Sequence, residues 1–428
     1  MRTLALCALT VGLGAAILGG CGGSQLPISS PATGTQALRA MKSSLQVLYR
    51  FGHNGTSSGG ENPSGGLLDM AGNLYGTTQY GGLGGNGGNG VVYNVTTTGA
   101  EKVLYSFQGY EYGDGFRPVD GVIDVNGTLY GTTEYGGHCN AGTVYSLSTT
   151  GAETVLHSFC YSSGGNAGGG LLYVKGTLYG TTSSGGTSND GVVYSLGTSG
   201  AYKVLYSFKG GTDGINPTGR LLNVNGTLYG VTFGGGTGCS YGDNGCGTVF
   251  SITKSGQEKV LHTFQGAPDG ALPTGGLIDI KGTLYGTTTW GGIAPGSTRG
   301  DCPTFSCGTV YSISTSGTEK VLYRFRGGSH GASPSTGLLE MNGTLYGTLS
   351  SGGNLCGHGS YQFGCGMLFS MTTSGRNEQT LHRFRGSDGA IPNDLIDFDH
   401  VMYGTTYRGG YTSECGGDGC GAVFAFTP

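Results

Sequence analysis

The chain has 428 residues and 93 glycines, about three times the usual share of glycine in globular proteins. Charged residues make up 11% of the chain and the formal net charge is −4, so no basic face is expected for a nucleic acid. Glycine does not recur at every third position, which excludes a collagen triple helix. The glycines instead follow a long repeat, which excludes low-complexity disorder as the main state of the chain.

The N-terminus has the features of an export signal followed by a tether. Residues 4–18 are an apolar run behind Arg2, shorter than a membrane-spanning helix needs. Residues 18–21, Leu-Gly-Gly-Cys, resemble a bacterial lipobox, which implies cleavage before Cys21 and lipidation of that cysteine. An ordinary cleaved signal peptide with an incidental cysteine is the alternative. Residues 22–44 are rich in Ser, Pro, Thr and Gly, as in a flexible tether.

These features predict how the chain divides into segments and where in the cell the protein is located. We expect a signal peptide at residues 1–20, the lipidated cysteine and tether at 21–44, and a folded domain at 45–428. The protein is then expected in a bacterial cell envelope, anchored by lipid at the outer membrane or the cell surface.

One five-residue phrase, Leu-Tyr-Gly-Thr-Thr, recurs seven times with single replacements in three copies. The copies begin at Leu74, Leu129, Leu178, Leu228, Leu284, Leu345 and Met402. Each copy has one apolar run before it, and the first six copies have two after it, the second of which ends in Phe; the last copy has one after it, and a further run ending in Phe51 precedes the first unit. A full unit therefore contains four short runs rich in Val, Leu, Tyr, Phe and Thr, which favour β-strands.

The turns between these runs predict antiparallel pairing. Asn-Gly separates the first two runs at Asn126, Asn225 and Asn342, and it suits the positive φ angles of a two-residue hairpin. In the last unit Asp399 and His400 replace Asn-Gly, so this hairpin departs from the pattern. Each unit is expected to be a four-stranded meander. Since one such sheet cannot bury both of its faces, seven of them predict an all-β, seven-bladed β-propeller.

The ends of the repeat region predict how the ring closes. The region opens with a lone fourth-type strand at residues 45–51 and ends after a third-type strand at residues 421–426. The N-terminal strand would complete the last blade and leave no free sheet edge at that point. An open solenoid would need capping repeats instead.

The repeated Tyr-Gly-Thr-Thr and Gly-Thr-Val-Tyr-Ser phrases resemble those of bacterial tandem-repeat proteins of the GloVer type, which carry various surface-anchoring signals. The resemblance covers about residues 45–428. It implies a secreted and anchored protein, and it brings no catalytic residue to assign.

Long, variable loops are expected on one face of the ring, where binding usually lies. Ten cysteines remain after Cys7 and Cys21, and an even number in an exported protein predicts disulfides. The expected bridges are Cys139–Cys160, Cys239–Cys246, Cys302–Cys307, Cys356–Cys365 and Cys415–Cys420. Zinc is the alternative, but pairs on different blades cannot supply four converging ligands. We therefore expect no metal and no cofactor.

Two residues follow each Tyr-Gly-Thr-Thr phrase on the variable face, and they differ among the blades. The candidate ligand-binding residues among them are Tyr80, Glu134, Tyr135, Phe233, Trp290, Tyr407 and Arg408. Aromatic rings with polar groups beside them suit sugars or protein partners, and packing beneath the loops is the alternative. Trp290, the sole tryptophan, begins the longest of these loops and is expected to contribute most.

An Asp-Gly-x-x-Pro segment precedes the first strand in several blades. Its aspartates are Asp114, Asp213, Asp269 and Asp388. One interpretation is an acidic ring around the central channel. The other is a turn in which the aspartate bonds the backbone, and repetition in most blades favours this turn.

Together these features favour a lipid-anchored, surface-exposed propeller that binds a glycan or a protein through its long-loop face. A polysaccharide hydrolase or lyase is the alternative, which would need Glu134, His138, His358 and Arg408 to converge. We expect a monomer that has no nucleic-acid partner and meets the membrane only through its lipid.

Overall fold

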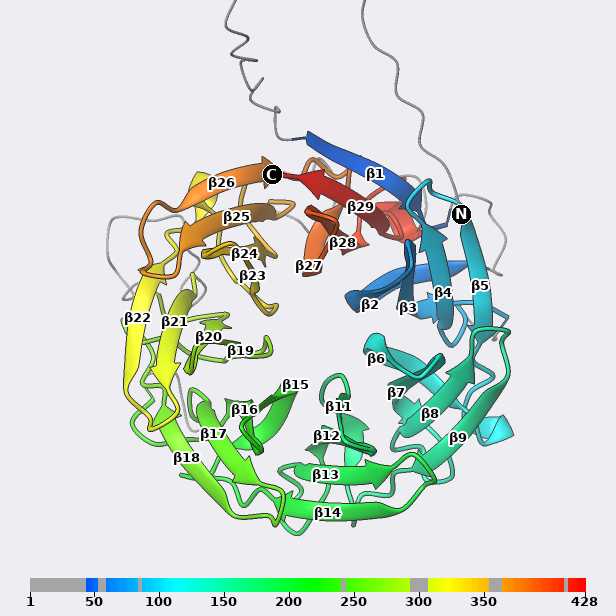
Figure 1. The fold of residues 1–428 in the computed structure, drawn as a ribbon, viewed down its shortest axis with the longest axis horizontal. Helices are drawn as coiled ribbons and strands as arrows, with labels where there is room; N and C mark the ends of the chain where they lie inside the picture. The colour runs from blue at the N-terminus through cyan, green and yellow to red at the C-terminus, as the bar shows by residue number, and fades with distance from the viewer. Residues whose placement is uncertain are drawn as a thin grey trace, which may run out of the picture. The chain divides into compact units, whose positions relative to one another are not determined.

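The computed structural model describes residues 44–52, 59–83, 87–239, 244–292, 307–353, 364–411 and 415–428. Figure 1 shows seven antiparallel sheets arranged as blades around a ring, so the predicted seven-bladed propeller is confirmed. Cys21 and the expected tether, except Ser44, lie outside the described residues, and Ser44 is the first residue of the N-terminal strand. Within the described residues, no helix has the length and apolar character required to traverse a membrane.

We number the blades 1 to 7 by their innermost strands in chain order. The innermost strands are β2 (Gly60–Met70), β6 (Gly115–Val125), β10 (Gly165–Ala167) with β11 (Leu172–Val174), β15 (Ile215–Val224), β19 (Ile278–Ile280), β23 (Leu339–Met341) and β27 (Ala390–Phe398). The second strands are β3 (Asn73–Gly81), β7 (Thr128–Gly136), β12 (Thr177–Ser184), β16 (Thr227–Gly234), β20 (Thr283–Thr288), β24 (Thr344–Leu349) and β28 (Val401–Arg408).

The two outer layers complete each blade. The third strands are β4 (Val91–Thr96), β8 (Thr143–Ser148), β13 (Val192–Gly197), β17 (Thr248–Thr253), β21 (Thr309–Ser314), β25 (Met367–Thr372) and β29 (Ala422–Thr427). The outermost strands are β5 (Glu101–Ser106), β9 (Glu153–Ser158), β14 (Tyr202–Ser207), β18 (Glu258–Thr263), β22 (Glu319–Arg324), β26 (Gln379–Arg383) and β1 (Ser44–Arg50). Three short 3₁₀ turns are η1 (Tyr110–Tyr112), η2 (Gly328–His330) and η3 (Cys415–Gly417).

The ring closes as the two ends of the repeat predict. Strand β1 pairs antiparallel with β29, from Ser44 opposite Thr427 to Arg50 opposite Ala422. The last hairpin also forms, because Asp399 and His400 both adopt positive φ angles of 52° and 61°. These are the angles that a two-residue hairpin requires, so the Asn-Gly pair is dispensable in this blade.

The glycine of the repeated phrase is explained by the aromatic residue of the third strand. A Cβ atom added at Gly131 would meet the hydroxyl and ring of Tyr145, and one at Gly230 would meet the ring of Phe250. The third-strand ring therefore lies directly over a second-strand glycine. This contact leaves no room for any other residue at that position of the phrase.

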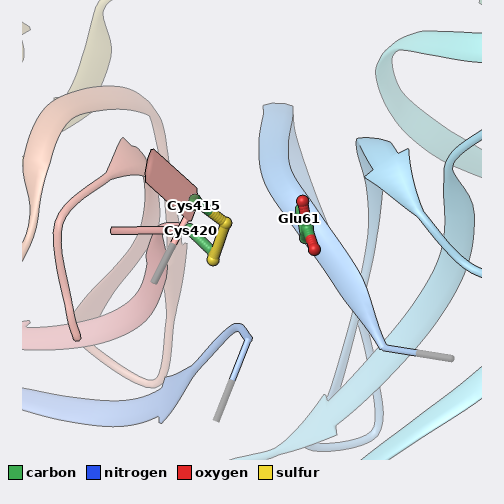
Figure 2. A group of neighbouring side chains, drawn as sticks. All are labelled: Glu61, Cys415 and Cys420. Atoms are coloured by element: carbon green, nitrogen blue, oxygen red, sulfur yellow. A yellow bond between two sulfur atoms is a disulfide. The ribbon is translucent and has the colours of Figure 1, made fainter. Parts of the chain in front are cut away.

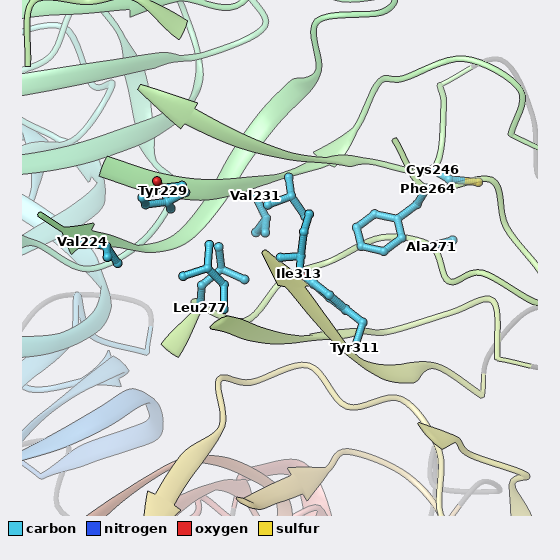
Figure 3. Close-up of a cluster of buried hydrophobic side chains, with 11 residues drawn as sticks. Val224, Tyr229, Val231, Cys246, Phe264, Ala271, Leu277, Tyr311 and Ile313 are labelled. Atoms are coloured by element: carbon cyan, nitrogen blue, oxygen red, sulfur yellow. The ribbon is translucent and has the colours of Figure 1, made fainter. Parts of the chain in front are cut away.

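The phenylalanine that ends each unit joins neighbouring blades. Its ring packs edge-on against the third-strand aromatic of the next blade, with centroid distances of 5.0 to 5.4 Å. The pairs are Phe51–Tyr93, Phe107–Tyr145, Phe159–Tyr194, Phe208–Phe250, Phe264–Tyr311, Phe325–Phe369 and Phe384–Phe424. Figure 3 shows one such interface, in which Phe264 and Val231 of blade 4 face Tyr311 and Ile313 of blade 5. The core is thus a series of layers between blades.

Disulfides form between cysteines that the sequence pairs. Three complete bridges are described, Cys139–Cys160, Cys239–Cys246 and Cys415–Cys420, with Cα–Cα distances of 5.2, 5.3 and 5.4 Å. Cys307 and Cys365 are also disulfide-bonded, whereas their expected partners, Cys302 and Cys356, lie outside the described residues.

Because all five bridges are expected, the exported protein should contain no free thiol beyond position 21. A thiol reagent added to the purified protein in denaturant, without reductant, measures this directly. Two or more reactive thiols per chain would contradict the five-bridge assignment.

Candidate functional site

In six of the seven phrases, all except that of blade 6 with its Leu349, the second threonine holds the residues that follow it at the base of the long loop. In blade 2 the Thr133 hydroxyl donates to the Tyr135 carbonyl at 2.9 Å and accepts from the Thr143 amide at 3.1 Å. The same two bonds recur in blades 1, 3, 4, 5 and 7. The backbone that carries the candidate residues is therefore fixed, and the blades differ there mainly in side chains.

Blades 1 and 2 bring two tyrosines together around one arginine. The Arg117 guanidinium carbon lies 5.4 Å from the ring centroids of both Tyr80 and Tyr135. Phe116 stacks on the Tyr135 ring at 5.2 Å with an interplanar angle of 22°. Glu134 places Oε2 3.4 Å from Arg117 Nη1. This arrangement combines flat apolar surfaces with charged hydrogen-bonding groups.

Arg117 occupies a backbone position that favours asparagine. It precedes Pro118 with a φ of 55°, a left-handed conformation that most residues avoid and that a following proline disfavours. The equivalent residues in all seven blades have positive φ angles: Asn62, Arg117, Asn166, Asn216, Leu272, Ser333 and Ile391. Asn62 and Asn166 use their side-chain amides to bond backbone carbonyls of the preceding blade, at 2.9 and 3.2 Å. Arginine is therefore not needed there for the backbone.

Blade 7 adds a third tyrosine to this cluster. The Tyr407 hydroxyl donates to Gln79 Oε1 at 3.1 Å, across the closure of the ring. Burial, and then the neighbouring Tyr80, raises the pKa of Tyr407. Arg408 lies over the Tyr407 ring at 5.7 Å and pairs with Asp418 at 2.6 Å. We call Tyr80, Arg117, Glu134, Tyr135 and Tyr407 the tyrosine surface.

Two candidate residues lie away from the tyrosine surface. Phe233, on blade 4, has 39% of its surface exposed. Trp290, on blade 5, packs partly against the buried cluster between blades 4 and 5, and its backbone exchanges two 2.9 Å hydrogen bonds with Ala271. The seven candidates therefore separate into a group of five on blades 7, 1 and 2, and two residues on other blades.

The four loop aspartates accept hydrogen bonds beside the outermost strands. Asp114 Oδ2 accepts from the Tyr105 hydroxyl at 2.9 Å and from the Gln108 amide at 2.7 Å. Asp213 is bonded in the same way, and histidines take the place of the tyrosine beside Asp269 and Asp388. None of the four lines the central cavity, so the charged groups of the channel come from other residues.

Within the part of the chain that the structure describes, two clusters have the composition of metal ligands. His262, Asp269 and Glu319 place ligand atoms within 4.8 Å of one another. The contact between His262 and Asp269 in this group is equivalent to one in blade 3, where the Tyr206 hydroxyl donates to Asp213. The second cluster joins Glu61 to Cys415 and Cys420, but Figure 2 shows the two sulfur atoms in a disulfide, so neither is a thiolate ligand.

The ring encloses a central cavity of about 450 Å³ that all seven blades line. The cavity wall is formed by the innermost strand of each blade or by the residues just before it, and most of the residues that directly precede the recurring apolar position there are glycine. A Cβ atom at Gly65 would meet Asp120 of the next blade, and one at Gly275 would meet the backbone of Thr336. The blades therefore approach so closely here that side chains are mostly excluded.

Three charged residues break this ring of glycines. Asp120, Arg220 and Asp394 come from blades 2, 4 and 7. Arg220 Nη2 lies 3.7 Å from Asp120 Oδ2, while Asp394 Oδ1 accepts from the Gly337 amide at 2.7 Å. Burial, and then the Asp120 carboxylate, raises the pKa of Asp394, and the Gly337 amide and Arg220 act in the opposite direction. We call these three residues the channel charges.

The cavity and the tyrosine surface are continuous. Tyr407 belongs to the tyrosine surface and also lines the cavity, where its hydroxyl bonds Gln79, another lining residue. A ligand lying on the tyrosine surface could therefore extend one end toward the channel charges.

Comparison with known protein families identifies the repeat. The family model described as the Gloeobacter/Verrucomicrobia repeat matches residues 35–242, 161–361 and 236–424. The chain belongs to this family. A comparison with curated proteins gives no match.

Solved structures similar to this Gloeobacter/Verrucomicrobia repeat protein have low identity. TolB of Acinetobacter baumannii is 14% identical with a TM-score of 0.38, over 73% of this chain and 64% of TolB. A gluconolactonase of Xanthomonas campestris is 11% identical with a TM-score of 0.43, over 90% of this chain and 89% of the enzyme. These similarities transfer no functional residue to the repeat protein.

Five residues of this repeat protein that build the site were not predicted: Phe116, Arg117, Asp120, Arg220 and Asp394. A usable signal lies in the repeat itself. When the units are aligned, Asp120, Arg220 and Asp394 stand where other blades have glycine, and Arg117 stands where three blades have asparagine.

Proposed function

We propose that this protein binds a glycan chain on the tyrosine surface, with one end of the chain at the central cavity. The observation that carries the proposal is the placement of Arg117 between Tyr80 and Tyr135, with Glu134 beside it. Tyrosine rings offer flat apolar faces to sugar rings. The guanidinium and carboxylate groups around them can bond sugar hydroxyls.

A glycan suits this surface better than a protein partner does. Tyr407 lines a cavity with charged residues in its wall that can hold one end of a narrow chain, whereas protein interfaces usually need a broad apolar centre. The lipobox-like segment ending at Cys21 would anchor the propeller in the cell envelope, where polysaccharides are available. Anchorage and surface exposure are parts of this proposal.

A glycan array probed with the full mature chain tests the proposal. The best glycan is then titrated calorimetrically against the natural protein, Tyr80→Ala and Phe233→Ala. We expect Tyr80→Ala to weaken binding at least about tenfold, because a rigid aromatic contact is lost. Phe233→Ala removes an exposed ring from blade 4 and should leave the affinity unchanged. Absence of glycan binding, or equal effects of the two variants, would overturn the proposal.

A second candidate function, glycan hydrolysis, rests on the carboxylates of Asp120 and Asp394 in the cavity. Their environments differ, since Asp120 faces Arg220 and the pKa of Asp394 is raised, a pattern found in acid–base pairs. Of the residues expected earlier for catalysis, Glu134 pairs with Arg117, Arg408 pairs with Asp418, and His138 is exposed. His358 lies outside the described residues. Release of reducing ends from a bound glycan, abolished by Asp394→Asn, would support hydrolysis.

A further inference from the structure

We propose that the central cavity binds a primary ammonium group, so that the preferred ligand is a glycan ending in an amino sugar with a free amine. This inference rests on the proposed function, because the glycan must first lie on the tyrosine surface. It specifies the class of glycan and assigns recognition of the amine to Asp120 and Asp394.

Asp120 and Asp394 stand at positions where most other blades have glycine, which indicates a role that the other blades do not share. Most residues at this level of the ring are glycine. Asp120 Oδ1 accepts from the amides of Gly66 and Gly121, and Asp394 Oδ1 accepts from the amide of Gly337, so one oxygen of each carboxylate already bonds the backbone of the ring. Asp120 has a φ of 59°, while Gly65 and Gly219 in blades 1 and 4 have φ angles of 70° and 69°. Aspartate tolerates this left-handed conformation less well than glycine does. A residue kept in a less favourable conformation points to a use for its side chain.

The charge balance of the cavity favours a cation. Among the described residues that line it, Asp120 and Asp394 are acidic and Arg220 alone is basic, so the three sum to one negative charge. Arg220 lies 3.7 Å from Asp120. Asp394 accepts one backbone amide and is partly buried in the cavity wall, where a carboxylate is less well solvated than in water. A ligand that brings one positive charge would compensate it.

The chemistry of the site selects an ammonium group rather than a divalent metal ion. The nearby Arg220 guanidinium would repel a divalent metal ion more strongly than it would repel a singly charged ammonium group. An ammonium group has three N–H donors, which match carboxylate oxygens and the backbone carbonyls of the glycine-rich ring. The volume of about 450 Å³ is also in the range of cavities that hold small organic ligands.

Two oligosaccharides that differ only at the amine test this inference. The full mature chain is titrated with a tetramer of glucosamine and with the corresponding tetramer of N-acetylglucosamine, whose nitrogens carry no charge. We expect the glucosamine tetramer to bind at least about tenfold more tightly at neutral pH. Asp394→Asn should remove this preference, while Asp397→Asn, an exposed substitution on the same strand, should keep it.

Acidification gives a second readout. The charged groups that act on Asp394 are Asp120 and Arg220, and its pKa is raised, so its carboxylate is neutralised at a higher pH than an ordinary aspartate. The preference for the amine should therefore weaken as the pH falls toward about 5. Asp120→Gly, which suits the local backbone, should reduce the preference without loss of folding.

The outcomes separate the inference from the proposed function. Equal affinity for the two tetramers, a preference that survives Asp394→Asn, or binding that requires added Ca²⁺ would each overturn the ammonium assignment. If other glycans still bind in a Tyr80-dependent manner, the proposed function stands without it. If no glycan binds at all, both fail.

Discussion

A variant that lacks residues 45–51 should aggregate or lose most of its stability. The deletion removes β1, so blade 7 keeps three strands and β29 becomes an exposed edge. It also removes Phe51, whose buried ring packs against Tyr93 and links blade 7 to blade 1. Thermal unfolding followed by circular dichroism, together with size-exclusion chromatography, measures the effect.

Two controls make this prediction specific to the closure. A variant lacking residues 22–43 keeps β1 and should melt like the natural protein. Phe51→Ala, which removes only the ring, should cost about 3–5 kcal/mol, close to the cost of Phe159→Ala at an ordinary interface between blades. If the protein without residues 45–51 melts at an unchanged temperature, the N-terminal strand does not close the ring.

Arg117→Asn should weaken glycan binding at least about tenfold and leave the melting temperature unchanged or slightly higher. Asparagine suits the left-handed backbone at this position, as in Asn62, Asn166 and Asn216. The substitution removes the guanidinium that lies against both Tyr80 and Tyr135. Titration of the glycan found on the array, alongside a thermal melt, measures both effects.

Ser333 is the residue of blade 6 that is equivalent to Arg117, and its φ angle is 58°. Ser333→Asn is therefore the matched control, since it makes the same backbone-compatible change away from the tyrosine surface. It should alter neither the affinity nor the melting temperature. A large fall in melting temperature for Arg117→Asn, with a proportionate loss of binding, would make the arginine a packing residue.

The fold could be predicted because each recurring residue has one structural task in every blade. The glycine of the phrase lies beneath a third-strand ring, and the terminal phenylalanine joins the next blade. The pairing of β1 with β29 that closes the ring also follows from the order of strand types at the two ends of the repeat region. The replacement of Asn-Gly by Asp399 and His400 did not prevent the last hairpin from forming, because both residues adopt the positive φ angles of the turn.

The site was harder to predict, because it depends on which blades become neighbours in space. Tyr407 and Gln79 are 328 residues apart and meet only when the ring closes. The phrase marks where the candidate residues lie along the chain, but it does not indicate which side chains turn toward one another. Arg117 was missed because it stands at a variable position of a segment interpreted as a turn.

The channel charges were not predicted from the sequence either, because they lie in glycine-rich segments. Glycine was interpreted as a turn residue, whereas in the innermost strands it permits close approach of neighbouring blades. Against that background a single Asp120 or Asp394 is informative, but only once the units are aligned. The structure does not test the expectation that Trp290 contributes most to binding, and the proposed glycan site replaces Trp290 with Tyr80 and Tyr135. Trp290 packs against the buried cluster between blades 4 and 5, which gives it a structural role.

The most direct test is a crystal structure of the full mature chain with the oligosaccharide identified on the array. We expect sugar rings in contact with Tyr80 and Tyr135, and one end of the chain entering the cavity beside Tyr407 and Asp394. Sugar bound instead over blades 3 to 6, at Phe233 or Trp290, would contradict the assignment of the tyrosine surface as the binding site.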